Sequence, residues 1–124
     1  MVLIIGGACQ GKLDFAREKF HLRESDIYRC TGPEIDFSRR CICHLEKFSR
    51  DALSAGLLPE EYLRKHQTLW QDTVFICQDI FCGVVPTEPE LRRWRDETGK
   101  LCQLLARDAT QVYRIFCGLE LKLK

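Results

Sequence analysis

A glycine-rich segment followed by a lysine lies near the start of the chain and has the composition of a phosphate-binding loop. Gly6 and Gly11 are separated by four residues, and Lys12 follows directly. Glycines let backbone N–H groups converge on phosphate oxygens, the helix after such a loop adds partial positive charge, and the lysine reaches the outer phosphates. We therefore predict an ATP- or GTP-binding loop made of Gly6, Gly7, Ala8, Cys9, Gln10, Gly11, Lys12 and Leu13. Lys12 is the candidate catalytic residue, because phosphoryl transfer depends on neutralising the charge of the transferring group.

The position after the lysine departs from the usual pattern. Phosphate loops place Ser or Thr there to bind Mg²⁺ through its hydroxyl, whereas this chain has Leu13. Asp79 follows an apolar run, where P-loop proteins often keep an acid directed at the metal, and we predict that Asp79 holds Mg²⁺ through water and assists catalysis. The competing interpretations are a glycine-rich turn with a surface lysine at Lys12 and an ordinary turn carboxylate at Asp79.

One cluster of metal-ligand residue types stands out among the eight cysteines, namely Cys41-Ile42-Cys43-His44. We expect no metal there, because Cys41 falls on the apolar face of a predicted helix, where a free cysteine behaves as a small hydrophobe. A metal would also need ligands from a second cluster, and the sequence offers none. Without a Cys-x-x-Cys pair or a secretory signal, we expect reduced thiols.

The elements that would position these residues follow from hydrophobic periodicity. We predict strands at residues 2–5, 27–30, 73–77 and 112–117, with residues 119–124 as an edge strand or hairpin partner. We predict helices over residues 12–21 and 37–52, from Pro59 onward, and behind a capping box at residues 87–90 through 109. Asp36 and Gly56 would cap the second helix. Alternating strands and helices indicate an α/β fold of the P-loop NTPase-like kind, with a mainly parallel sheet flanked by helices and residues 1–124 as a single domain.

Composition and charge limit the classes of molecule that this chain is expected to bind. Nineteen Lys and Arg residues against eighteen Asp and Glu give a formal net charge of +1, which lacks the basic excess that nucleic-acid binding needs. The apolar start, Met1 to Ile5, is too short for a secretory signal or a membrane span. We therefore expect a cytoplasmic protein that binds neither nucleic acid nor a membrane.

The loop and the stretch from Thr73 to Lys124 resemble the bifunctional adenosylcobinamide kinase/adenosylcobinamide-phosphate guanylyltransferase family. Residues 78–86, Gln-Asp-Ile-Phe-Cys-Gly-Val-Val-Pro, are similar to the family's Asn-Glu-Val-Gly-x-Gly-Ile/Val-Val-Pro loop, and residues 92–96, Arg-Arg-Trp-Arg-Asp, to its Arg-Arg-Phe-Arg-Asp. The family's helix and its ending are matched by Gly99, residues 103–106, Gly118 and the final Leu123-Lys124. The resemblance implies a nucleotide-dependent kinase of adenosylcobinamide or a related corrinoid, working as a homo-oligomer, typically a trimer.

The chain also departs from that family. Leu13 stands where the family has Ser or Thr, and Cys102 stands where it has Asn. Family members are longer between the second strand and Thr73, in the region that carries the guanylyl-accepting histidine and an Arg-Pro signature; this chain has no Arg-Pro pair. His44 lies at a comparable point of a predicted helix, with Arg40 one turn before it, but no motif gives it that role. We interpret His44 as a histidine at the edge of the core.

Three functions therefore stay open at this stage. The first is an adenosylcobinamide kinase-like phosphotransferase of cobalamin biosynthesis, with guanylyl transfer in doubt. The second is a degenerate, non-catalytic nucleotide-binding or partner module, favoured by Leu13 and the missing segment. The third is a kinase of another small molecule, because a fold does not fix the substrate.

Overall fold

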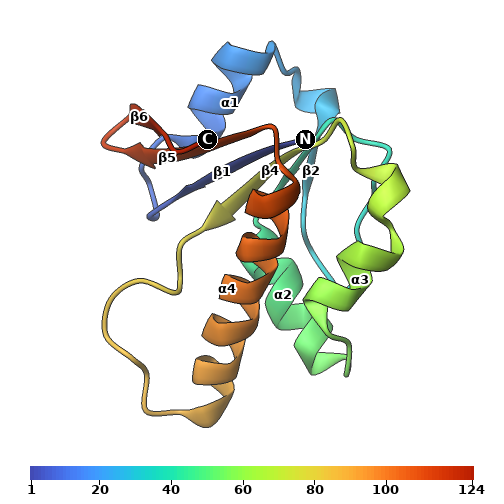
Figure 1. The fold of residues 1–124 in the computed structure, drawn as a ribbon, viewed down its shortest axis with the longest axis vertical. Coiled ribbons are helices and arrows are strands. Elements are labelled where there is room, and N and C mark those ends of the chain that lie inside the picture. Colours follow the sequence, from blue (N-terminus) through green and yellow to red (C-terminus); the bar gives the residue numbers. More distant parts are fainter.

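Six strands form one sheet in the computed structural model, which describes residues 1–124 (Figure 1). The strands are β1 (Val2–Gly6), β2 (Ile27–Arg29), β3 (Cys41–Cys43), β4 (Val74–Gln78), β5 (Gln111–Phe116) and β6 (Leu119–Lys122). Their order across the sheet is β2-β3-β4-β1-β5-β6. All neighbours are parallel except β6, which runs antiparallel to β5 at the edge. The mainly parallel α/β arrangement predicted from the sequence is confirmed.

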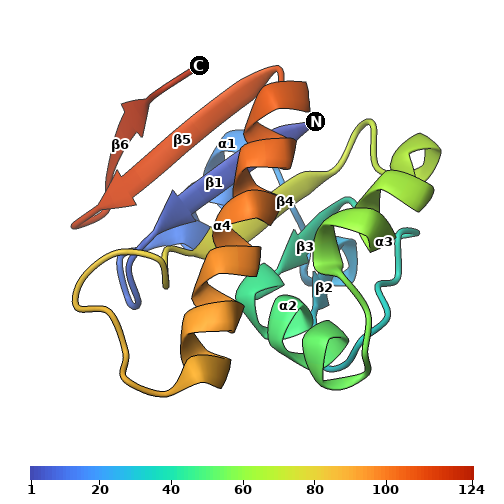
Figure 2. The same ribbon diagram turned by 60° about the horizontal axis from the view of Figure 1, so that its bottom comes forward.

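Helices cover both faces of the sheet (Figure 2). Helix α1 (Lys12–Phe20) lies on one face, whereas α2 (Leu45–Ser54), α3 (Pro59–Lys65) and α4 (Pro89–Asp108) lie on the other. Two short 3₁₀ turns, η1 (Glu24–Asp26) and η2 (Gln67–Leu69), complete the chain. Side chains alternate along each strand. Leu3 of β1 joins the larger core under α2, α3 and α4, and Ile4 joins the smaller core under α1.

One predicted helix is wrong over its first half. Residues Cys41–Cys43 form the strand β3, and α2 begins only at Leu45. All three β3 residues are buried, and a strand buried on both faces is a continuous apolar run whose pattern does not separate it from a helix segment. Asp36 accepts hydrogen bonds from the N–H and hydroxyl of Ser38 in a turn instead of capping a helix. Gly56, with φ +77°, follows the end of α2 in the left-handed conformation, as predicted for a helix end.

The start of α4 also differs from its prediction. Glu88 occupies the N-cap position and no side chain caps the helix, so the predicted capping box at residues 87–90 is wrong. Pro89 is the first helical residue, where its fixed φ and missing N–H cost nothing. The proline therefore determines the helix start here.

Arginines of the first turns of α4 hold the long loop between β4 and α4. Arg92 donates to the carbonyl of Thr87 over 2.7 Å. Arg95 donates over 2.8–3.2 Å to the carbonyls of Phe81, Gly83 and Val84. These two side chains therefore fix the loop that contains residues 78–86, the segment similar to the family's loop.

Candidate nucleotide site

The glycine-rich loop leaves the carboxyl end of β1, the strand that lies between β4 and β5. Gly6 is packed against the neighbouring strand so closely that a Cβ atom on it would lie 2.5 Å from the carbonyl oxygen of Ile115. Its own carbonyl accepts a hydrogen bond of 3.2 Å from the N–H of Asp79, just past β4. The first residue of the loop therefore has to be glycine, and it is fixed from both sides.

The middle of the loop is held by the turn between β5 and β6. The Gln10 side-chain oxygen accepts a hydrogen bond of 2.6 Å from the N–H of Cys117, and the Gln10 carbonyl accepts one of 2.9 Å from the N–H of Gly118. Gly11 has φ +90°, and a Cβ on it would lie 3.5 Å from the Cα of Gly118. We call these contacts the Gln10 clasp. It connects the loop to a segment more than a hundred residues later in the chain.

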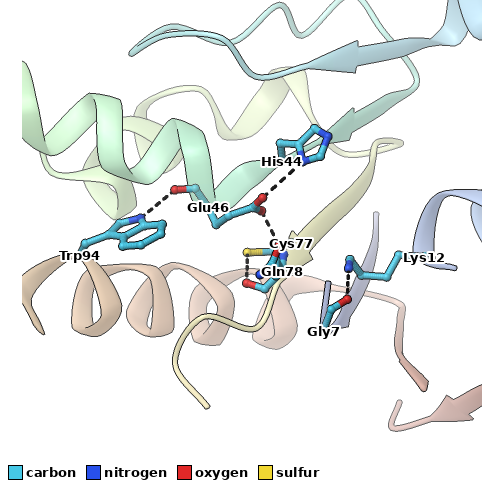
Figure 3. Close-up of polar contacts among 7 residues, drawn as sticks. All are labelled: Gly7, Lys12, His44, Glu46, Cys77, Gln78 and Trp94. Atoms are coloured by element: carbon cyan, nitrogen blue, oxygen red, sulfur yellow. Dashed lines mark hydrogen bonds and ion pairs between the residues drawn. The ribbon is translucent and has the colours of Figure 1, made fainter. Parts of the chain in front are cut away.

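Lys12 is the first residue of α1 and curls back over the loop. Its Nζ donates a hydrogen bond of 2.5 Å to the carbonyl of Gly7 (Figure 3). The ammonium group forms no salt bridge with a carboxylate, so its charge is free to meet an anion. The loop and the helix N-terminus together form an arrangement that favours phosphate groups.

A cleft of about 450 Å³ lies beside this loop. Residues Ala8 to Leu13 of the predicted site line it together with Asp14. The other wall comes from β3, β4 and the start of α2, through Cys43, His44, Glu46, Ile76 and Gln78. Gly6 and Gly7 form the base of the loop and do not line the cleft.

Glu46 is the acid in the wall opposite the loop, and it was not predicted from the sequence. Its side chain is only 6 % exposed. One carboxylate oxygen accepts a hydrogen bond of 3.0 Å from the N–H of Gln78, and the other lies 3.3 Å from Nδ1 of His44 (Figure 3). Its carbonyl accepts a hydrogen bond from Trp94 of α4. The available signal was an acid three residues after a buried Cys-Ile-Cys run, which the helix prediction concealed.

His44 connects β3 to α2 and is not on a helix, so its predicted placement was wrong. It is the N-cap residue of α2 with φ +60°, a left-handed conformation that a non-glycine residue adopts at some cost in energy. Its side chain is 44 % exposed and borders the cleft. Arg40 does not accompany it, since its guanidinium contacts Asp26 and the carbonyl of Phe20.

Asp79 lies directly after β4, as expected, but on another side of the loop. Its side chain is 10 % exposed and pairs with Arg114 of β5 over 3.6 Å. It lies beside Gly7, where a Cβ would be 3.9 Å from the Asp79 oxygen, and it does not line the cleft. Leu13 is half-buried, packs against the core under α1 and also lines the cleft. Leu13 and Asp79 therefore flank the loop from different directions.

Four of the buried thiols are held in their protonated, unreactive form. Burial raises the pKa of Cys30 and Cys41 to about 12, and burial also raises the pKa of Cys43. A hydrogen bond with Cys102, together with burial, raises the pKa of Cys77 well above its ordinary value. These thiols stay protonated at neutral pH. No three His, Cys, Asp or Glu side chains lie together so that they could hold a metal ion.

The sheet, the loop after β1 and the helix that follows define an α/β protein of P-loop-like architecture. The family model for cobinamide kinase / cobinamide phosphate guanyltransferase matches residues 55–123, more than half of the chain, and the chain therefore belongs to this family. The match covers α3 to β6 and does not include the loop at Gly6 to Leu13. A search of curated proteins found no match. None of the helices combines the length and apolar composition that crossing a membrane requires.

Proposed function

We propose that this chain binds a nucleoside triphosphate at the loop from Gly6 to Leu13 and phosphorylates the hydroxyl of cobinamide, as adenosylcobinamide or a related corrinoid. Membership of the family supports the acceptor, because the family's description names cobinamide. One observation carries the proposal: Lys12 and Glu46 line the same cleft from opposite walls. The ammonium group of Lys12 would bind the phosphates, and the pair of Glu46 and His44 in the other wall would bind the acceptor hydroxyl.

The nucleotide side of the cleft would use charge and position. The loop amides and the N-terminus of α1 would hold the phosphates, and Lys12 would exchange its bond to the Gly7 carbonyl for a charge-assisted bond to an outer phosphate. Positioning and charge neutralisation supply most of the rate in phosphoryl transfer. No residue of the loop has to act as an acid or base.

The acceptor side would use His44. With Nδ1–H donating to Glu46, the ring has an unprotonated Nε2 that can accept a proton. The acceptor oxygen would attack the γ-phosphorus, the bond to the β–γ bridging oxygen would break, and the nucleoside diphosphate would leave. The hydroxyl proton would pass to Nε2 of His44. The N–H of Gln78 keeps Glu46 in place for this role.

The chain offers Mg²⁺ few ligands. Both oxygens of Glu46 already have partners, and Leu13 has no hydroxyl. Mg²⁺ in nucleotide sites keeps several waters and uses one or two carboxylates plus the phosphates. Asp79 lies beside Gly7 but pairs with Arg114 and does not line the cleft, so it would reach an ion only through water; we propose it on these terms as the residue that holds Mg²⁺. The ion, when bound, would reduce the negative charge of the phosphates.

A second candidate is a non-catalytic module that binds nucleotide and acts as a partner in cobalamin biosynthesis. Leu13 favours it, because an apolar side chain lines the cleft where the metal-binding hydroxyl is usual. We do not include guanylyl transfer in the proposal, since the Arg-Pro signature is absent.

Two measurements separate these functions. Calorimetry with ATP and GTP tests binding, and mass spectrometry of cobinamide incubated with the chain, nucleotide and Mg²⁺ tests for a phosphate ester. Binding with ester formation supports the kinase, and binding without it supports the non-catalytic module. No binding of either nucleotide at millimolar concentration contradicts both. Lys12→Ala is the loss variant, and Lys47→Ala, at an exposed position of α2, is its matched control.

A further inference from the structure

A second cavity lies between α2 and α4, two helices that pack side by side on one face of the sheet (Figure 2). Its volume is about 200 Å³, and none of its lining residues also lines the cleft beside the glycine-rich loop. We call it the α2–α4 pocket, and its main lining residues are Arg50, Leu53, Glu90, Leu91, Arg93 and Trp94. The proposed function does not use this pocket.

The apolar residues of the α2–α4 pocket are half-buried. They are Leu53 of α2 with Leu91 and Trp94 of α4. The indole ring of Trp94 is fixed, because its Nε1 donates a hydrogen bond of 2.8 Å to the carbonyl of Glu46 (Figure 3). Two leucines and a fixed flat ring form a surface on which the apolar body of a small molecule can pack.

Two arginines of the pocket, one from each helix, have no acidic partner. Arg50 and Arg93 are exposed, and neither forms a salt bridge, although Glu90 lies three residues before Arg93 at the spacing of a helical ion pair. The Arg50 guanidinium lies instead over the ring of Trp94, 5.4 Å from its centre. Guanidinium groups without a carboxylate partner can donate to the carboxylate or phosphate of a ligand.

The charge of the pocket favours an anion. Two guanidinium groups against the single carboxylate of Glu90 leave a positive charge in excess. Helix α4 begins beside them at Pro89 without a side-chain cap, and its N-terminus adds partial positive charge. The molecule that matches both the charge and the apolar surface is an anion with an apolar body. A cavity of this volume is smaller than the usual site for a drug-sized ligand, so a body of one ring fits it.

We propose that the α2–α4 pocket binds a small organic anion, whose carboxylate or phosphate group contacts Arg50 and Arg93 and whose apolar body packs on Leu53, Leu91 and Trp94. Trp94 joins the pocket to the wall that carries Glu46, so a ligand that moved the indole ring would act on that wall. The proposal does not depend on the proposed function.

Nuclear magnetic resonance of the two tryptophans tests the pocket. On titration with phenyl phosphate or benzoate, the indole N–H signal of Trp94 should shift with half-saturation at about 1 mM or below. The signal of Trp70, which is buried and donates to the carbonyl of Leu63, should stay unchanged. Trp94→Phe assigns the two signals. Saturation by either compound supports the proposal, and comparing the two shows whether the pocket takes a carboxylate or a phosphate group.

Two further compounds separate the contributions of charge and apolar surface. Inorganic phosphate lacks the apolar body, and benzyl alcohol lacks the charge. Each should bind about tenfold more weakly, or worse, than the better of the two organic anions. Equal binding of inorganic phosphate or of benzyl alcohol would overturn the proposal.

Variants of the two arginines locate the bound anion. Arg50→Gln and Arg93→Gln should each raise the dissociation constant by about tenfold or more, because each removes charge-assisted hydrogen bonds. Arg107→Gln, at an exposed position near the end of α4, is the matched control, and circular dichroism checks the fold. Neither Arg50 nor Arg93 lines the nucleotide cleft, so a shift caused by binding there would persist in both variants. No shift of the Trp94 signal at about 10 mM ligand, or an affinity that either arginine variant leaves unchanged, would overturn the proposal.

Discussion

The carboxylate of Glu46 accepts a hydrogen bond of 3.0 Å from the backbone N–H of Gln78, which connects the first turn of α2 to the carboxyl end of β4. Its other oxygen lies 3.3 Å from His44, and no lysine or arginine pairs with it. A buried carboxylate is costly unless it is hydrogen-bonded, and here both partners belong to the cleft wall. The contact therefore restrains the ring of His44, which lines the same cleft as the loop.

Replacing Glu46 by glutamine should separate chemistry from binding. The amide can still accept from Gln78, but its NH₂ group would face Nδ1 of His44 and favour the tautomer whose Nε2 is protonated. Turnover with cobinamide should fall by about 10²-fold or more, while the dissociation constant for nucleotide stays unchanged. Glu61→Gln, at an exposed position of α3, is the control. An equal loss in nucleotide affinity would place Glu46 with the phosphates instead.

Removing the ammonium group of Lys12 should weaken nucleotide binding. Lys12→Ala should lower the affinity for ATP or GTP by roughly 1.5–3 kcal/mol, the range for a lost charge-assisted hydrogen bond. Calorimetry measures this, with Lys47→Ala as the matched surface control. Because Lys12 bonds only to the Gly7 carbonyl, the melting temperature without nucleotide should change little. Unchanged affinity would show that the loop is only a turn.

The missing hydroxyl at position 13 should make nucleotide binding depend weakly on Mg²⁺. Leu13→Ser should strengthen Mg²⁺-dependent binding by restoring the ligand. Because Leu13 is half-buried against the core under α1, the same change should cost about 1–2 kcal/mol of unfolding free energy, less than a full core truncation. Urea unfolding and calorimetry, each with and without Mg²⁺, give the two quantities. Tight Mg²⁺ linkage in the wild type, unchanged by Leu13→Ser, would show that other groups hold the metal.

Thiol labelling should divide the cysteines into two classes. Cys9, Cys82 and Cys117 are exposed and should react with iodoacetamide at pH 8. The four buried thiols whose pKa values are raised, Cys30, Cys41, Cys43 and Cys77, remain protonated and should not react until the chain unfolds. Nucleotide should slow labelling of Cys9, which lines the cleft, and leave Cys82 unaffected. Peptide mass spectrometry measures the extent of labelling at each cysteine. Equal protection of Cys9 and Cys82 by nucleotide would argue against nucleotide binding at the loop.

Histidine-linked guanylylation should be absent. A base at His44 exchanges a proton and forms no covalent bond to the nucleotide, and the Arg-Pro signature of the family is missing. Incubation with GTP and mass spectrometry under conditions that preserve phosphoramidates test this. A GMP adduct on His44 would replace the base role by that of a nucleophile.

Features of the candidate site that depend on residues close together in the sequence were predictable. Features that depend on contacts between residues far apart in the sequence were not. The position of the loop between a strand and a helix was predictable because the spacing of Gly6, Gly11 and Lys12 is local, and its binding of nucleotide stays a prediction. Glu46 was not predicted because the buried strand Cys41–Cys43 has the apolar pattern of a helix segment, and the helix predicted over residues 37–52 leaves Glu46 outside its apolar face. The Gln10 clasp and the Asp79–Arg114 pair join residues far apart in the sequence, and no local pattern indicates them.

The Gln10 clasp would transmit a change at the loop to the turn between β5 and β6. The turn Cys117-Gly118 holds the loop through Gln10 and leads directly into β6, the exposed edge strand of the sheet. A nucleotide that shifted the loop would therefore also shift the turn, and a molecule bound at the turn would act on the loop through the same hydrogen bonds. By thermodynamic reciprocity, whatever factor nucleotide applies to binding at the turn, binding at the turn must apply to the affinity for nucleotide.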